Sequence, residues 1–123
     1  MSEPIVFLVL SFKKRNRELL SQVLVQADYQ VIAVGNYEEL EQALFHSGTV
    51  NLGLIDLAVC DRRIGSYCEQ LQAADIPFFA FTPQYNPVVE QDSLAHGARS
   101  VLVKPLVIKN LLSLINSLVG KLA

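Results

Sequence analysis

Four short apolar segments stand out along the chain because they lack the alternation of polar and apolar residues that a half-exposed strand shows. They are Ile5–Leu10, Leu52–Ile55, Phe78–Phe81 and Ser100–Val103. Such segments are typical of strands that are covered on both faces, and strands of that kind imply a parallel sheet. Val31–Val34 is a fifth candidate strand.

A segment with helical character follows each candidate strand. The spacing predicts helices over about Asn16–Ala27, Asn36–Gly48, Ile64–Ala74, Pro87–His96 and Val107–Leu122. In the first of them the apolar residues recur on one face, which is the pattern of a helix that docks on a core. These residues are Leu19, Leu20, Val23 and Leu24.

Two signals mark helix ends. Asn36 can cap the free backbone N–H groups of the second helix, with Glu39 in the position of a capping box. Gly97 follows the fourth helix, and glycine is the residue type that most readily adopts the left-handed conformation of a C-terminal cap.

Strands and helices therefore alternate along the whole chain. This order predicts right-handed crossovers and a three-layer α/β sandwich, a doubly wound parallel sheet of five strands with five helices. The 123 residues fit one domain, residues 1–123. Ligands of such sheets bind beyond the carboxyl ends of the strands, where this chain has Ser11, Phe12, Gly35, Asp56, Leu57, Thr82, Pro83, Lys104 and Pro105.

The composition indicates a protein with a large core. Hydrophobic residues make up 51% of the chain and the mean hydropathy is +0.33, yet no apolar run approaches the roughly 20 residues of a membrane helix. The apolar stretch near the start is also shorter than the roughly 7–15 residues of a signal-peptide core, and it lacks a basic lead. We therefore expect a cytoplasmic protein that does not enter the membrane.

Charge and cysteine content exclude further classes. The net charge of −2 and the pI near 5.6 argue against a general nucleic-acid surface. The basic cluster Lys13–Arg17 is most simply the solvated start of a helix. Cys60 and Cys68 lack the spacing of a zinc site or of a disulfide framework, so we expect reduced, inert thiols.

Three polar residues follow three different candidate strands: Asp56, Thr82 and Lys104. In a parallel sheet they converge on one edge. There an aspartate can accept a phosphoryl group as a nucleophile, a lysine can neutralise the resulting charge, and a threonine hydroxyl can bond to a phosphoryl oxygen. Singly, these residues would be a turn former, a strand former and a surface lysine, but their joint placement favours a site.

The chain resembles the receiver domain of bacterial response regulators from Ile5 to about Leu118. Four motifs stand in the family's order and at its distances: LID at Leu54–Asp56, FTP at Phe81–Pro83, AHGA at Ala95–Ala98 and VKPL at Val103–Leu106.

The resemblance implies a flavodoxin-like sheet with strand order 2-1-3-4-5. It further implies that Asp56 is the phosphoacceptor, that Thr82 is the switch hydroxyl and that Lys104 is the phosphate-contacting ammonium. The peptide bond from Lys104 to Pro105 would be cis, a form that proline permits at modest cost.

The first strand departs from the family where two adjacent acidic residues usually hold a magnesium ion. This chain has Ser11 and Phe12 at those positions. Asp56 remains as the one carboxylate of the usual set, so we expect weak or absent Mg²⁺ binding and no other cofactor. Without the ion, phosphorylation should be slow or absent.

Two kinds of residue could compensate for the missing acidic pair. Lys13 or Lys14 could replace the ion by pairing with Asp56. Asp61 could be a substitute acid, although a solvated loop residue is the simpler interpretation.

The loop and relay positions are altered as well. Cys60 stands where the family often has a proline, Pro83 follows Thr82 where a small residue is usual, and Val101 replaces the rotating aromatic. A valine cannot report the state of Thr82 by swinging inward. These departures suggest a pseudo-receiver.

On the last predicted helix the apolar residues cover an arc of about 160°, wider than the roughly 100° stripe that a docked helix needs. They are Val107, Ile108, Leu111, Leu112, Leu114, Ile115, Leu118, Val119 and Leu122. A broad core face and a partner-binding surface explain this arc equally well. By resemblance, the partner would be a second copy of the chain or an output domain.

The sequence thus predicts a regulatory protein-interaction module of a two-component or phosphorelay system, with weak or absent phosphorylation of Asp56 and no enzymatic activity. Its partners by resemblance are a histidine kinase, another signalling protein or an output domain, with no nucleic acid and no membrane.

Three alternatives remain open. The first is a phosphorylation-competent receiver that accepts a phosphoryl group from a histidine kinase on Asp56. The second is a receiver fold without signal input, in which Asp56, Thr82 and Lys104 persist as a buried ion pair with its hydrogen bond. The third is a flavodoxin-like small-molecule binder or enzyme, although the chain has no GxGxxG, P-loop or GxSxG motif.

Overall fold

The computed structural model describes residues 5–46, 50–56, 64–82, 84, 87–95, 97–103 and 107–122. Within them, parallel strands form one sheet in the order β2-β1-β3-β4-β5, which confirms the predicted fold class. The strands are β1 (Val6–Leu10), β2 (Gln30–Val34), β3 (Leu52–Asp56), β4 (Phe78–Thr82) and β5 (Ala98–Val103).

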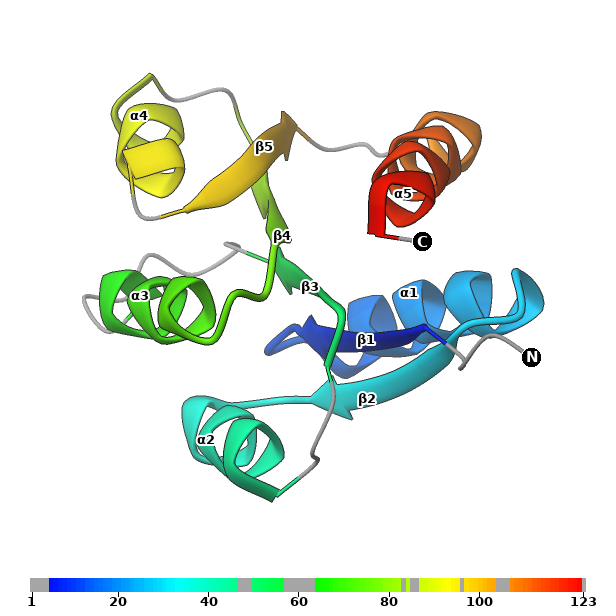
Figure 1. Cartoon of the computed structure of the whole chain (residues 1–123), viewed down its shortest axis with the longest axis horizontal. Coiled ribbons are helices and arrows are strands. Elements are labelled where there is room, and N and C mark those ends of the chain that lie inside the picture. Colours follow the sequence, from blue (N-terminus) through cyan, green and yellow to red (C-terminus); the bar gives the residue numbers. More distant parts are fainter. Residues whose placement is uncertain are drawn as a thin grey trace.

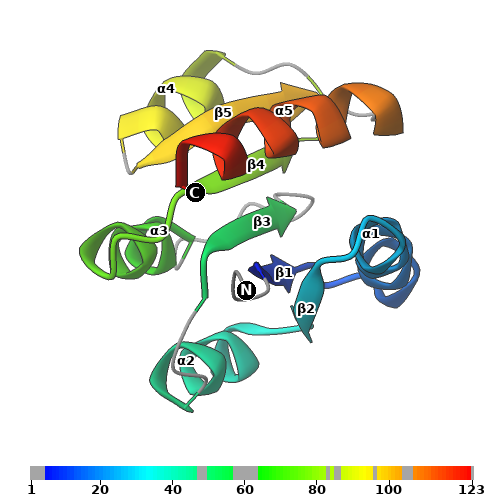
Figure 2. The same cartoon turned by 45° about the vertical axis from the view of Figure 1, so that its right-hand side comes forward.

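Helices follow the strands in strict alternation. In the described residues they are α1 (Lys14–Gln26), α2 (Tyr37–His46), α3 (Ile64–Ala73), α4 (Pro87–Ala95) and α5 (Ile108–Leu122). Figure 1 shows α1 and α5 on one side of the sheet and α2, α3 and α4 on the other, and Figure 2 shows the same three layers after a turn of the molecule. No boundary departs from the predicted one by more than two residues.

The central strands feed two separate cores, because successive side chains of a strand point to opposite faces of the sheet. The core beneath α1 and α5 contains Phe7, Val9, Leu20, Leu24, Leu52, Leu54, Phe79, Phe81, Leu111 and Ile115. The core on the other face contains Leu8, Leu10, Val34, Leu40, Ile55, Cys68, Leu71, Ile76, Phe78, Ala80 and Ala98. Burial on both faces explains why these strands are continuously apolar in sequence.

Two of the predicted apolar surfaces are less covered than expected. Residues 100–102 of β5 are only half-buried and Val103 is 40% exposed, because β5 lies at an edge of the sheet. On α1, Leu19 is 51% exposed, and Leu20 and Leu24 are the buried residues of this helix.

The predicted helix-end signals are confirmed. Asn36 Oδ1 accepts a hydrogen bond from the N–H of Glu39 at 2.8 Å, and Glu39 Oε1 accepts one from the N–H of Gly35 at 3.1 Å. Gly97 adopts a φ of 106°, the left-handed conformation that favours glycine. At the start of α1, by contrast, Lys13 makes no side-chain cap bond and the first turn has no acidic residue.

The apolar arc of α5 is divided between core and surface. Leu111 and Ile115 are buried, and Leu118 and Val119 pack against the same core. Among the members whose burial the structure describes, Ile108 and Leu114 are exposed, as is Val107, which directly precedes the helix. No helix in the part of the chain that the structure describes is both long and apolar enough to cross a membrane.

Two leucines of α5 give a matched test of this division. Leu111→Ala should lower the free energy of unfolding by about 2–5 kcal/mol, because it removes a buried side chain and leaves a cavity. Leu114→Ala should cost about 1 kcal/mol or less, because Leu114 is already 40% exposed. Urea unfolding followed by circular dichroism measures both, and equal losses would contradict the docking of α5 described above.

Cys68 is a free, buried thiol in the core beneath α2 and α3. Burial, followed by the nearby charges of Asp92 and Glu69, raises the pKa of this thiol from 9.0 to about 11. Since the thiolate is the reactive form of cysteine, these surroundings agree with the inert thiol that the sequence predicts. Cys60 lies outside the described residues.

Cys68 should make the folded protein less stable as the pH rises from about 9 to about 11. In this range the unfolded thiol, with a pKa of 9.0, loses its proton while the folded thiol keeps it, so a rising pH favours the unfolded state. Urea midpoints of the wild type should therefore fall more steeply over this range than those of Cys68→Ala. Identical pH dependence of the two proteins would show that the folded thiol is not protected.

Candidate functional site

Asp56 ends β3, the central strand of the sheet, and its side chain is buried with 1% exposure. A carboxylate withdrawn from water requires hydrogen-bond donors. Ser11 Oγ donates to Asp56 Oδ2 at 3.0 Å, and Asn16 Nδ2 donates to the same oxygen at 3.3 Å. The end of β1, the first turn of α1 and the end of β3 therefore meet at this carboxylate.

The register of the sheet puts Ser11 beside Asp56. Leu10 of β1 pairs with Ile55 of β3, so the residue after each of them comes next on the same edge. Ser11 is completely buried, and its N–H donates to the carbonyl of Val34 at 3.2 Å, which extends the contact between β1 and β2 by one residue. A small neutral donor at this position satisfies Asp56 without adding a second buried charge.

Arg17 holds the end of β1 through the main chain of Ser11. Its Nη1 donates to the carbonyl oxygen of Ser11 at 2.9 Å. The guanidinium lies against Gly35, where a Cβ would be only 2.5 Å from Arg17 Nη1. Gly35 is therefore required for the close approach of Arg17, and any side chain at this position would displace the guanidinium.

Phe12 and Lys14, which lie between Ser11 and Asn16, have neighbours other than Asp56. Phe12 is half-buried and packs against the core beneath α2 and α3. Lys14 Nζ lies 3.8 Å from Glu18 Oε1, and the two side chains are 79% and 66% exposed.

The hypothesis that a lysine of this pair replaces the metal ion is wrong in this structure. Among the described residues, neither Lys13 nor Lys14 pairs with Asp56. The reason is geometric: Lys14 and Glu18 are four residues apart on one helix face. The first turn of α1 instead presents Asn16 to the carboxylate.

Thr82 ends β4, the neighbour of β3, and is 5% exposed. Asp56 pairs in register with Phe81, so Thr82 is the next residue along the same edge. The Thr82 hydroxyl donates to the main-chain oxygen of Gln84 at 2.9 Å. Because a hydroxyl has one proton to donate, Thr82 would have to leave Gln84 before it could donate to a phosphoryl oxygen.

Lys104 comes directly after Val103, the last residue of β5, and lies outside the described residues. Its contact with Asp56 or with a phosphate stays a prediction, as does the cis bond to Pro105. The other predicted positions that lie outside the described residues are Leu57, Cys60, Asp61 and Pro83. Val101 is half-buried and packs against the core that contains Ala80.

The described residues do not fit a magnesium ion. Mg²⁺ prefers six oxygen ligands that include carboxylates, and the described part of the chain contains no group of three His, Cys, Asp or Glu side chains that could hold a metal. The receiver family has an acidic pair at the positions of Ser11 and Phe12. In this chain the Ser11 hydroxyl donates to Asp56, and Phe12 has a benzyl side chain that cannot bind a metal. Neutral donors, rather than metal ligands, surround the carboxylate at Ser11 and Asn16.

Asn16 and Arg17 are site residues that the sequence pattern does not predict. The basic cluster indicates only a solvated helix start, and Asn16 stands near that start. The available signal was the strand order, because a helix that follows β1 begins at the carboxyl edge, next to the end of β3. Polar residues in its first turn are therefore close to Asp56.

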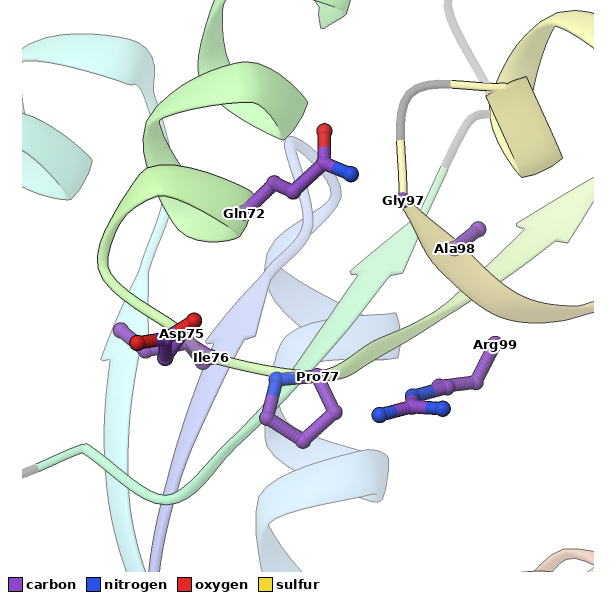
Figure 3. Close-up of a pocket in the computed structure, with 7 residues that line it drawn as sticks. All are labelled: Gln72, Asp75, Ile76, Pro77, Gly97, Ala98 and Arg99. Atoms are coloured by element: carbon purple, nitrogen blue, oxygen red, sulfur yellow. The ribbon is translucent and has the colours of Figure 1, made fainter.

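A separate pocket of about 310 Å³ lies at the amino ends of the strands, on the opposite side of the sheet from the carboxyl ends (Figure 3). Its lining comes from the end of α3, the turn that follows and the beginning of β5: Gln72, Asp75, Ile76, Pro77, Gly97, Ala98 and Arg99. The amino ends of parallel strands lie opposite their carboxyl ends, so this pocket is not part of the site around Asp56.

Solved structures of receiver domains share this fold. A two-component response regulator from Clostridium difficile matches with a TM-score of 0.88 and 18% identity, over 96% of this chain and 98% of the other. A CheY-like receiver domain protein from Methanospirillum hungatei JF-1 matches with a TM-score of 0.86 and 18% identity, over 97% and 96%.

The signal receiver domain of a DNA binding response regulator from Colwellia psychrerythraea 34H matches with a TM-score of 0.83 and 21% identity, over 94% of this chain and 98% of the other. No protein-family model matches the sequence, and no curated protein matches it. The chain therefore has the receiver fold, and a fold alone does not determine function.

Restoring the acidic pair should make the stability of the protein depend on a metal. In Ser11→Asp/Phe12→Asp, the melting temperature should fall by several degrees without a cation, because the new carboxylates repel Asp56 and the packing of Phe12 on the core is lost. Millimolar Mg²⁺ should raise it again by the part that is due to repulsion, because the ion binds the folded state only.

The matched control is Ser11→Asn/Phe12→Asn, which makes the same positions polar without adding charge. Its melting temperature, like that of the wild type, should be the same with and without Mg²⁺. A wild-type protein stabilised by Mg²⁺ to the same extent as the aspartate variant would show that the ion finds ligands elsewhere.

Proposed function

We propose that this chain is a single receiver-like domain, residues 1–123, that acts as a regulatory protein-interaction module in two-component or phosphorelay signalling, with weak or absent phosphorylation of Asp56. The observation that carries the proposal is the hydrogen bond from Ser11 to Asp56 at 3.0 Å. By resemblance, the position of Ser11 holds a metal ligand in a phosphorylated receiver, whereas Ser11 in this chain donates a hydrogen bond to the carboxylate of Asp56.

Electrostatics supports weak phosphorylation. Transfer to a carboxylate brings a phosphoryl group with several negative charges against an anion, and catalysis of this step depends on cations placed around it. Ser11 and Asn16 supply hydrogen bonds but no charge. Burial of Asp56 also leaves little of its side chain open to an incoming phosphodonor.

The proposed activity is binding, not catalysis. The solved structures with the same fold are signalling domains, and we extend from them the classes of partner: a histidine kinase, another signalling protein or an output domain, in the cytoplasm. Val107, directly before α5, and Ile108 and Leu114 of α5 are exposed apolar side chains that suit contact with an output domain or with a second copy of the chain.

A phosphorylation-competent receiver is the second candidate. The observation in its favour is that Asp56 and Thr82 stand at the ends of neighbouring strands, where a phosphoryl group on the carboxylate could meet the hydroxyl. Lys104 would complete the set as the phosphate-contacting ammonium. In this case the transfer would need another source of positive charge, because the usual acidic pair is absent and cannot hold a metal ion.

Incubation with acetyl phosphate and Mg²⁺, followed by intact-mass spectrometry, separates the two candidates. The wild type should gain little or no phosphoryl mass, because Ser11 and Phe12 supply no carboxylates for a metal ion that would neutralise part of the incoming charge. Ser11→Asp/Phe12→Asp should gain more, and adding Asp56→Asn to this variant should abolish the gain. A stable, complete phosphorylation of the wild type that is lost in Asp56→Asn would favour the second candidate.

A further inference from the structure

The start of α1 carries a concentrated positive charge. We define the basic patch as Lys13, Lys14, Arg15 and Arg17; the first three are exposed and the last is half-buried. These residues are four of the ten Lys and Arg of the chain, and residues 13–17 contain none of its twelve Asp and Glu. The rest of the chain therefore has six basic and twelve acidic residues, so a patch of charge +4 stands on a remainder of −6.

The fold makes little use of these cations. The side chains of Lys13 and Arg15 make no hydrogen bond or ion pair within the part of the chain that the structure describes. Lys14 pairs with Glu18 at 3.8 Å between two largely exposed side chains, and such pairs contribute little to stability. Arg17 is the member of the patch that donates a hydrogen bond to the main chain, from one N–H group to the carbonyl of Ser11.

The patch also opposes the electrostatics of its own helix. The amino end of a helix is partially positive, so cations there are repelled and acidic residues are favoured. The next helix along the chain, α2, follows this rule, with Glu38 and Glu39 in its first turn and a cap from Asn36. The side chains of Lys13 and Arg15 are unfavourable at a helix start and have no partner among the described residues, as is expected of cations whose complementary charge comes from an anionic partner.

We propose that the basic patch docks a short acidic segment of a partner protein at the rim of the Asp56 site. One turn of helix with its preceding residue spans only about 7 Å, which suits a few carboxylates of a peptide. The Glu39 carboxylate borders the patch on one side. It lies near the Arg17 guanidinium, since a Cβ built on Gly35 would be 2.5 Å from Arg17 Nη1 and 3.3 Å from Glu39 Oε1. A nucleic-acid backbone or a lipid surface would bring its own negative charge onto this border, whereas a peptide segment need not.

The patch is contiguous with the site through Asn16. This residue lies between Arg15 and Arg17 in the first turn of α1 and donates to Asp56. A partner on the patch therefore binds within one side chain of the acceptor carboxylate. Docking depends on the exposed cations and not on phosphorylation, so it can hold or fail independently of the proposed weak phosphorylation.

The experiment measures the binding of a short fluorescein-labelled peptide of alternating glutamate and serine by fluorescence anisotropy at physiological ionic strength. The test variant is Lys13→Glu/Arg15→Glu, which leaves the contacts of Lys14 and Arg17 in place. The matched control is Arg99→Glu/Lys109→Glu, which changes the net charge equally at exposed positions outside the patch. The dissociation constant should rise at least about tenfold in the test variant and stay within about twofold of the wild type in the control.

Equal losses in the two variants would overturn the proposal, because they would show a response to net charge alone. Tighter binding of a DNA duplex or of phosphatidylserine vesicles than of the peptide, with the same dependence on Lys13 and Arg15, would overturn the choice of partner. Thermal melting of Lys13→Glu/Arg15→Glu should be unchanged or raised, because acidic residues suit a helix start. A lowered melting temperature would show that these cations serve the fold, and would contradict the proposal.

Discussion

The hydrogen bond from Ser11 to Asp56 is the interaction on which the site depends. A carboxylate with 1% exposure at the end of the central strand is costly unless donors replace its water. Ser11 is in register to do so because β1 and β3 are neighbours, and Asn16 adds a second donor from α1. Ser11 and Asn16 stabilise the buried carboxylate by hydrogen bonds and bring no charge of their own to it.

The support of Ser11 extends well beyond its own strand. Arg17 donates to its carbonyl oxygen, Gly35 makes room for that guanidinium, and the N–H of Gly35 in turn donates to Glu39 in the capping box of α2. The ends of β1 and β2 and the starts of both following helices are thus joined by hydrogen bonds and close packing. These contacts fix the positions of four chain segments around the end of β1 relative to one another.

The fold could be predicted in detail because strands that are buried on both faces of a parallel sheet are continuously apolar in sequence. In β4, Phe78 and Ala80 enter one core while Phe79 and Phe81 enter the other. Asp56 and Thr82 were predictable as site residues because they end such runs. The exposure of Val103 was not, since it follows from an edge position rather than from local sequence. The pairing of Lys14 with Glu18 and the contact of Asn16 with Asp56 also escaped prediction, because several partners suit these side chains and only the orientation of the helix selects among them.

Arg17 and Gly35 constrain the order in which this protein can change over evolutionary time. While the guanidinium occupies the space where a Cβ would stand, 2.5 Å from Arg17 Nη1, a side chain at position 35 meets immediate steric opposition. The guanidinium is the far end of a flexible side chain, so it can move away from a new Cβ, but it then leaves the carbonyl oxygen of Ser11. A change at Gly35 is therefore expected to remove the Arg17 contact rather than the fold, and selection that keeps this contact also keeps the glycine.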